Sequence, residues 1–208
     1  EEAAVAAGAT IVIPDGMPIV WASRLLRRPL SARLAGSDLF SELWRHVEDG
    51  RVPAAVVASS AEVATHVRAA GPDVGVVVPP MFDVDDEPAV AGVVESVADA
   101  CTAVGARLLF VGVSMPKHHL IASRLARRWE GSAGPLPVVL LIGASPELHF
   151  GLVPRAPRWM QRTGTEWLHR LAREPRRLAR RYLVDDLRFL PLVWREWRGS
   201  RPSRALAS

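Results

Sequence analysis

Residues 53–79, PAAVVASSAEVATHVRAAGPDVGVVVP, predict a strand, a helix and a second strand in direct succession. The apolar runs at 53–58 and 73–79 are rich in Val, as strands buried on both faces are. Between them, residues 59–62 (Ser-Ser-Ala-Glu) form a capping box that begins a helix, and Gly71 followed by Pro72 ends it. Such a unit predicts two parallel strands joined by a helical crossover.

The same alternation extends along the first 150 residues. Further strand-like runs occupy 9–14, 106–113 and 136–143, and Ser37, Pro88 and Pro116 are expected to begin further helices. We therefore expect an α/β fold, a Rossmann-like and mostly parallel sheet with helices on both faces, over 1–150. Residues 151–208 are expected to form a separate helical appendage. The chain opens with Glu-Glu instead of Met, so we expect its true N-terminus to be missing.

The appendage is strongly basic. Residues 151–208 contain 14 Arg, no Lys, five acidic residues and four of the seven Trp, whereas the first 150 residues contain 12 basic and 17 acidic residues. Arg favours bidentate contact with phosphates and Trp favours membrane interfaces, so the asymmetry predicts an anionic partner.

An apolar stripe in the appendage has helical spacing. Arginines flank this stripe, which is the pattern of a helix lying in a membrane interface. The alternative is a helix that packs its Leu side chains on the protein and leaves its Arg in water. The stripe comprises Leu183, Leu187, Leu190, Trp194 and Trp197.

Several classes of function are excluded or disfavoured. The single cysteine, Cys101, excludes an intrachain disulfide and fits a reducing cytoplasm. No apolar run approaches the length of about 18 residues that a bilayer requires. No Walker loop, GxGxxG fingerprint or Ser-His-Asp arrangement can be assembled from the sequence.

Ligands of open α/β sheets bind at the carboxyl ends of the strands. Asp15, in Pro14-Asp15-Gly16, follows the first apolar run and is a candidate catalytic carboxylate, although Pro-Asp-Gly is also a turn signature. Lys117, at the start of a helix after the run 106–113, could hold a diphosphate together with free backbone amides. The alternative to a diphosphate site is an ordinary strand-to-helix turn in which Lys117 is solvated.

A metal site is not expected. Asp83, Asp85 and Asp86 could bind a metal, but an acidic loop that complements the dipole of the helix from Pro88 is the favoured interpretation. His118 and His119 are adjacent, and adjacent helical residues cannot chelate one ion as an i, i+4 pair does. We therefore expect neither a metal nor a cofactor.

Four sequence blocks resemble the WecG/TagA/CpsF family of bacterial glycosyltransferases, and the match covers nearly the whole chain. The most specific block is RAPRWMQRTGTEWLHRLAREPRRLARRYL, which follows the family pattern almost position by position. The blocks are 14–21 (PDGMPIVW), 31–39 (SARLAGSDL), 115–119 (MPKHH) and 155–183.

This resemblance implies a UDP-sugar-dependent hexosyltransferase of cell-surface polysaccharide or teichoic acid biosynthesis. The enzyme would transfer N-acetylmannosamine, or a related sugar, to undecaprenyl-diphosphate-linked GlcNAc, with inversion and without a metal. It would be cytoplasmic and peripheral on the inner face of the bacterial membrane. The C-terminal segment would bind anionic lipid and complete the active site, and self-association, which can displace that segment, stays open.

The resemblance also implies roles for individual residues. Asp15 matches the catalytic base, and Arg33 matches an arginine that positions the substrate. Lys117 and His118 fall in the block that contacts the donor. The tail arginines that would close over the pyrophosphate are Arg170, Arg177 and Arg180.

The chain also departs from the family pattern, since His118 and His119 stand where the family has Gln and Glu. An imidazole can still donate a hydrogen bond but is not an amide, which favours an altered donor or a lost activity. A diverged, non-catalytic module that binds a membrane or a partner is therefore the alternative. A nucleic-acid partner is not expected, because the basic residues accompany a Leu/Trp stripe and no nucleic-acid module is recognised.

Overall fold

The computed structural model describes residues 9–71, 73–132, 134–163, 165–173, 175, 179 and 189–199. The chain divides into two compact units. The sheet unit contains the residues up to Val12 and Gly36–Pro154, and the helical unit contains Ile13–Ala35 and the residues from Arg155 onward. The helical unit thus combines two stretches that are far apart in sequence. The functional division at residue 150 stays a prediction.

The sheet unit is built on four parallel strands in the order β2-β1-β3-β4. Val56 pairs with Val76 on one side and with Phe110 on the other, and Phe110 pairs with Leu140. The predicted parallel sheet is therefore confirmed, with strands inside four of the five predicted runs. The strands are β1 (Ala54–Val57), β2 (Gly75–Val77), β3 (Leu108–Val111) and β4 (Val138–Leu141).

The predicted strand over 9–14 is wrong. These residues have no regular secondary structure, and Ile11 and Val12 are exposed. The carbonyl of Ile13 accepts from the amide of Asp15 at 3.1 Å, and the carbonyl of Pro14 accepts from Leu34 at 3.1 Å. An apolar run becomes a strand only when a neighbouring strand forms hydrogen bonds with it, and here the carbonyls of Ile13 and Pro14 bond to a local turn and to residue 34 instead.

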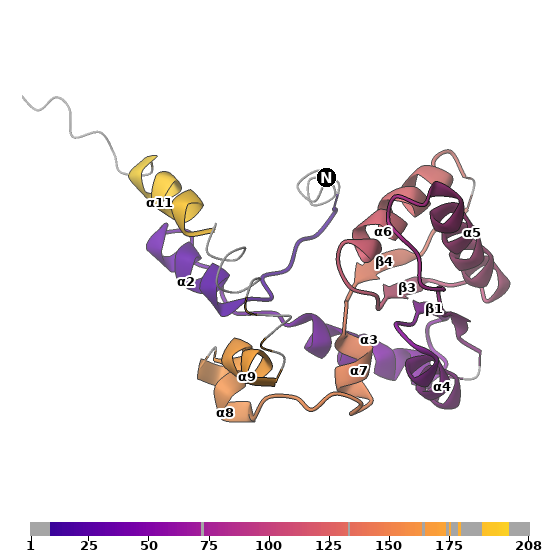
Figure 1. Ribbon diagram of the computed structural model, residues 1–208, viewed down its shortest axis with the longest axis horizontal. Helices are drawn as coiled ribbons and strands as arrows, with labels where there is room; N and C mark the ends of the chain where they lie inside the picture. Colours follow the sequence, from indigo (N-terminus) through magenta and orange to yellow (C-terminus); the bar gives the residue numbers. More distant parts are fainter. Residues whose placement is uncertain are drawn as a thin grey trace, which may run out of the picture. The chain divides into compact units, whose positions relative to one another are not determined.

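Helices cover both faces of the sheet, as predicted (Figure 1). On one face α5 and α6 pack on alternate strand residues, including Ala55, Val57 and Leu109. On the other face α3 and α4 pack on Ala54 and Val56. The helices of this unit are α3 (Gly36–Glu48), α4 (Ala61–Ala70), α5 (Glu87–Ala103), α6 (Lys117–Arg128) and α7 (Ser145–His149).

The helix starts show which sequence signals are reliable. The helix predicted from the capping box at 59–62 is present as α4, but its cap lies one residue later than the Ser-x-x-Glu pattern implies. Ser60 is the N-cap, since its hydroxyl accepts from the amide of Val63 at 3.3 Å. The prediction of Ser37 as an N-cap is wrong, because α3 already begins at Gly36 and Ser37 lies inside its first turn. A serine cap requires the residue to stay extended, and the helix here starts before Ser37.

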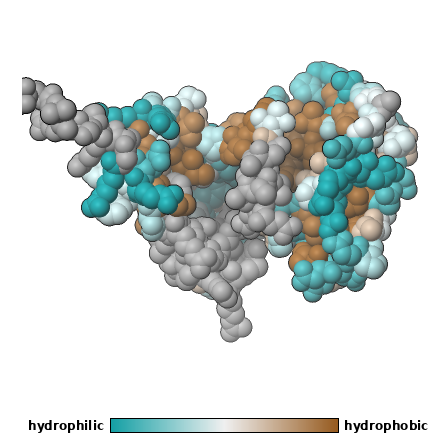
Figure 2. All heavy atoms as spheres, turned by 90° about the horizontal axis from the view of Figure 1, so that it is seen from above, coloured by the Kyte–Doolittle hydropathy of each residue, from teal (hydrophilic) through white to brown (hydrophobic). Residues whose placement is uncertain are grey.

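The helical unit comprises α2 (Met17–Leu25), α8 (Arg158–Thr163), α9 (Glu166–Arg173) and α11 (Phe189–Gly199) (Figure 1). From Arg158 onward the described part of the C-terminal segment is mainly helical, as predicted, whereas residues 151–157 form turns and irregular structure. Hydrophobic and hydrophilic residues lie side by side on the surface that contains α2 and α11, at the left of Figure 2. The exposed apolar side chains there are Ile19, Trp21, Leu25, Leu190, Leu192 and Trp194.

Cys101 lies in the core of the sheet unit, on the inner face of α5. Burial raises the pKa of its thiol to about 11. The thiol is thus protonated at neutral pH, which makes it unsuitable as a nucleophile.

We predict opposite effects for two glycine substitutions in the sheet unit. A Cβ at Gly75 would lie 2.7 Å from the carbonyl oxygen of Ala100, so Gly75→Ala must push β2 away from α5. We expect a loss of about 1–3 kcal/mol in the free energy of unfolding. The matched control, Gly92→Ala in the exposed interior of α5, meets no atom within 4 Å and should gain about 0.5–1 kcal/mol. Urea denaturation of both variants checks this, and a Gly75→Ala variant as stable as wild type would contradict it.

Candidate functional site

The carboxyl ends of β1 and β3 form the topological switch point of the sheet, because β2 lies on one side of this pair and β4 on the other. Just beyond it, the amide of Gly112 donates to the carbonyl of Val57 at 2.9 Å. A Cβ at Gly112 would lie 2.9 Å from the same carbonyl oxygen, so only glycine fits without a shift. Ligands of open α/β sheets bind at such a position.

A polar pair lies at this edge that the sequence did not indicate. The hydroxyl of Ser59, which follows β1, donates to Oε1 of Glu147 in α7 at 2.5 Å. Oε2 of Glu147 is buried without a hydrogen-bond partner among the described residues. A buried carboxylate oxygen of this kind is suited to accept hydrogen bonds from ligand hydroxyl groups. The sequence signal that could have indicated Glu147 was its position shortly after the apolar run 136–143, at the expected carboxyl end of a strand.

His118, one of the predicted site residues, is held in a defined orientation beside β3. Its Nδ1 lies 3.0 Å from the carbonyl oxygen of Val113, and because a carbonyl only accepts, Nδ1 carries the proton. The ring packs edge to face against His119, with centroids 4.4 Å apart. The structure thus places His118 at the carboxyl end of β3, as the sequence predicts, and its role in binding stays a prediction.

His149 at the end of α7 has a structural environment. Its Nδ1 lies 2.9 Å from Oγ of Ser41, and its ring contacts Phe40 and Phe150 edge to face. Burial lowers the pKa of His149, and nearby Glu48 only partly opposes this effect. The imidazole is therefore neutral at pH 7 and belongs to the aromatic packing of the unit.

Lys117 contacts an aromatic ring. Its Nζ lies 4.3 Å from the centroid of Phe82 and 3.7 Å from Sδ of Met81. The amides of His118 and His119, expected to be free at the start of α6, donate to backbone carbonyls at 3.4 and 3.1 Å. A ligand diphosphate would have to draw Lys117 away from a cation–π contact, so its role in binding stays a prediction.

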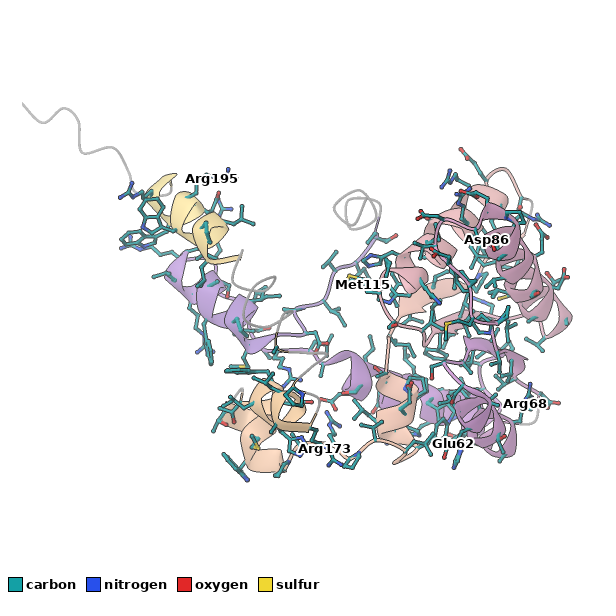
Figure 3. All side chains as sticks on the ribbon, viewed as in Figure 1. Glu62, Arg68, Asp86, Met115, Arg173 and Arg195 are labelled. Carbon is teal, nitrogen blue, oxygen red and sulfur yellow. The ribbon has the colours of Figure 1, made fainter. Side chains whose placement is uncertain are left out.

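The acidic loop before α5 has a structural role. Oδ1 of Asp86 accepts from the amide of Ala89 at 3.1 Å, which caps the helix at the position seen in Figure 3. Oδ1 of Asp83 accepts from the amide of Asp85 at 3.2 Å. Over the described ranges no three His, Cys, Asp or Glu residues are grouped as a metal site would need. The hydrogen bond from Ala89 makes Asp86 the N-cap of α5, which agrees with the favoured interpretation that the acidic loop complements the dipole of this helix.

The helical unit brings Asp15 and Arg33 together. Nε of Arg33 donates to the backbone carbonyl of Asp15 at 2.6 Å, and its Nη2 lies 3.7 Å from Oδ1 of Asp15. The side chain of Asp15 is 65% exposed, whereas that of Arg33 is only 18% exposed. An exposed carboxylate whose backbone is fixed by a largely buried guanidinium is a suitable general base.

Glu166 completes this cluster and was missed by the sequence analysis. It begins α9, and its Oε2 accepts from Nη2 of Arg33 at 3.0 Å. Its side chain is 10% exposed, so the pair is largely removed from water. Glu166 is one of five acidic residues in a segment with 14 Arg, a signal that could have been noticed.

The three tail arginines that are predicted to close over the pyrophosphate, here called the arginine clamp, have no described side chains. The backbone of Arg170 lies in α9, and its side chain is outside the described part of the chain. Arg177 and Arg180 also fall outside the described residues, as do Leu183 and Leu187 of the apolar stripe. Their roles stay predictions.

Comparison with known proteins identifies relatives. The model of the glycosyl transferase WecG/TagA/CpsF family matches residues 1–203. Two similar curated proteins are named N-acetylglucosaminyldiphosphoundecaprenol N-acetyl-beta-D-mannosaminyltransferase. The one from Bacillus spizizenii (strain ATCC 23059 / NRRL B-14472 / W23) is 26% identical over 181 residues, and the one from Bacillus subtilis (strain 168) is 27% identical over 187. Each alignment covers 85% of this chain and 66% of the relative, so the chain spans slightly less than two thirds of the relatives' length.

We predict that Asp86 contributes to stability as a cap and not as a metal ligand. Asp86→Ala should lower the free energy of unfolding by about 0.5–2 kcal/mol, because the amide of Ala89 loses its acceptor. Asp85→Ala, in the same loop, is the matched control and should change it by less than about 0.5 kcal/mol. Urea denaturation measures both. Stabilisation of wild type by Mg²⁺ or Mn²⁺ that Asp86→Ala abolishes would instead support a metal site.

Proposed function

Because the chain belongs to the WecG/TagA/CpsF family of glycosyltransferases, we propose that it transfers N-acetylmannosamine, or a related sugar, from a UDP-sugar. The proposed acceptor is undecaprenyl-diphosphate-linked GlcNAc. The names of the two Bacillus relatives, which describe a transfer to this acceptor, support the proposal. The product would enter cell-surface polysaccharide or teichoic acid. The observation on which the proposal depends most is the exposed carboxylate of Asp15 beside Arg33.

In the proposed reaction Asp15 is the general base. Its carboxylate takes the proton of the acceptor hydroxyl as that oxygen attacks the anomeric carbon of the donor sugar. A carbon–oxygen bond forms to the acceptor, and the bond from the anomeric carbon to the diphosphate breaks. The electron pair leaves with UDP, and attack from the opposite side inverts the anomeric centre.

The leaving diphosphate requires positive charge, and we propose that protein cations supply it without a metal or cofactor. Arg170, Arg177 and Arg180 would contribute from the C-terminal segment. Lys117 is proposed to bind phosphate as well, after leaving its contact with Phe82. At the switch point, Ser59 and Glu147 would bind hydroxyl groups of the nucleotide sugar, a proposal supported by the Glu147 oxygen that has no partner among the described residues. His118 would influence which donor is accepted.

We also propose that the helical unit contacts the cytoplasmic face of the bacterial membrane, where the acceptor lies. In α11 the exposed Leu190 and Trp194 are four residues apart and so lie on one helix face, accompanied by Arg195 (Figure 3). Arg28, just beyond α2, pairs with Glu196 at 3.9 Å, which brings the exposed apolar residues of α2 to the same part of the unit. No helix within the described ranges is long and apolar enough to span a bilayer. Self-association that displaces this segment would weaken both membrane contact and the clamp.

The catalytic proposal is tested by Asp15→Asn. Removing the base should lower acceptor-dependent UDP release by at least about 100-fold. Affinity for the UDP-sugar should stay within a few-fold, because the carboxylate acts on the acceptor. The assay uses UDP-N-acetylmannosamine with a soluble polyprenyl-diphosphate-GlcNAc analogue, and calorimetry gives the donor affinity.

Asp99→Asn, an exposed aspartate on the outer face of α5, is the matched control and should retain wild-type turnover. Turnover should also persist in EDTA if no metal is used. Turnover that survives Asp15→Asn would make Asp15 a turn residue only. A folded wild type that releases no UDP from any UDP-sugar would favour the alternative, a non-catalytic module.

The membrane proposal is tested by the double substitution Leu190→Ser and Trp194→Ser. Each side chain contributes about 1.5–3 kcal/mol when it is fully removed from water, so vesicle binding should weaken by more than about tenfold. Sedimentation with vesicles of phosphatidylglycerol and phosphatidylethanolamine measures this at low and high salt. Leu136→Ser, an exposed apolar residue of the sheet unit, is the control and should bind as wild type. Unchanged sedimentation of the double variant would refute the assignment of α11.

A further inference from the structure

One guanidinium in the helical unit lies between two carboxylates. Nη2 of Arg33 is 3.0 Å from Oε2 of Glu166 and 3.7 Å from Oδ1 of Asp15. The shorter distance is a hydrogen-bonded ion pair, whereas the longer one exceeds hydrogen-bond length. Arg33 therefore forms its hydrogen-bonded ion pair with Glu166, and its interaction with the Asp15 carboxylate is electrostatic only.

Burial accounts for this preference. The side chain of Glu166 is 10% exposed and that of Asp15 is 65% exposed. Attraction between charges grows as the effective dielectric falls, so Arg33 is bound more strongly by the carboxylate that is sheltered from water. An unpaired charge at the site of Glu166 would be costly, and this holds the pair together.

The same guanidinium also fixes the backbone next to the exposed carboxylate. Its Nε donates to the carbonyl of Asp15 at 2.6 Å, so Arg33 anchors the loop through the main chain. The Asp15 side chain keeps its oxygens available for another hydrogen-bond donor. Glu166 accepts a hydrogen bond from Nη2 of the guanidinium, the same atom that lies 3.7 Å from Oδ1 of Asp15.

We propose that Glu166 is a positioning residue that holds Arg33 away from the Asp15 carboxylate and so keeps that carboxylate available to the acceptor hydroxyl. The proposal rests on the proposed function, in which Asp15 is the base. It gives an acidic residue of the basic C-terminal segment a part in organising the site. Without Glu166 the guanidinium would form a direct ion pair with Asp15 and occupy the oxygen that must take the proton.

The test is Glu166→Gln in the full chain, a change that keeps the shape of the side chain and removes its charge. We expect kcat to fall by about 10–100-fold while KM for the UDP-sugar stays within about twofold, because only the base is obstructed. Glu166→Asp keeps the charge and should recover at least about a third of the lost rate. Glu95→Gln, in the exposed pair with Arg128 of the sheet unit, is the matched control and should match wild type.

A double substitution separates positioning from a general loss of structure. Arg33→Gln with Glu166→Gln should be no slower than Arg33→Gln alone, because Glu166 has no guanidinium left to restrain. A wild-type rate in Glu166→Gln, a loss confined to KM, or no recovery with Glu166→Asp would overturn the proposal.

A crystal structure of Glu166→Gln tests the geometry without any turnover. We expect Nη2 of Arg33 to move from 3.7 Å to within hydrogen-bond distance of Asp15 Oδ1. An unchanged distance would overturn the inference even if the enzyme is active. A silent wild type would count against the proposed function alone, since the movement of Arg33 would still be measured.

Discussion

Parallel strands form their backbone hydrogen bonds with neighbouring strands in the plane of the sheet. Both faces of the sheet must then be covered by apolar side chains. This requirement organises the sheet unit. On one face Phe40 and Trp44 of α3 pack around Phe110 of β3, with ring centroids 5.1 and 6.2 Å from it. On the other face the Val-rich side of α5 meets alternate residues of β1 and β3. With both faces occupied by helices, the carboxyl edge of the sheet is left for polar side chains.

That edge shows how the fold creates a site from ordinary residues. Gly112 permits β1 and β3 to approach closely at the switch point, and the loop after β1 meets helix α7, which follows β4, through Ser59 and Glu147. His118 is oriented by a carbonyl at the end of β3. None of these side chains alone indicates a binding site. Because they lie at the same edge of the sheet, together they are suited to bind a polar ligand.

The helical unit depends on a different constraint, the need of a largely buried guanidinium for a partner. Arg33 meets this need with Glu166 and at the same time anchors the main chain of Asp15. A stretch near the start of the chain and a helix from its last third are joined in this way. The C-terminal segment thus combines many arginines, suited to phosphate and lipid, with a largely buried acidic residue, Glu166, that pairs within the protein itself.

The sequence alone determined the parallel α/β sheet, the helix that begins near residues 59–62, the helix near Pro88 and the family, because these follow from local periodicity, helix-start signals and long motifs. It could not show that residues 9–14 form no strand, since strand formation depends on a neighbour that periodicity does not reveal. Nor could it pair Arg33 with Glu166 or Ser59 with Glu147, which are 133 and 88 residues apart. Only the tertiary structure decided these contacts, because distance in space and exclusion of water set the strength of an ion pair or a hydrogen bond.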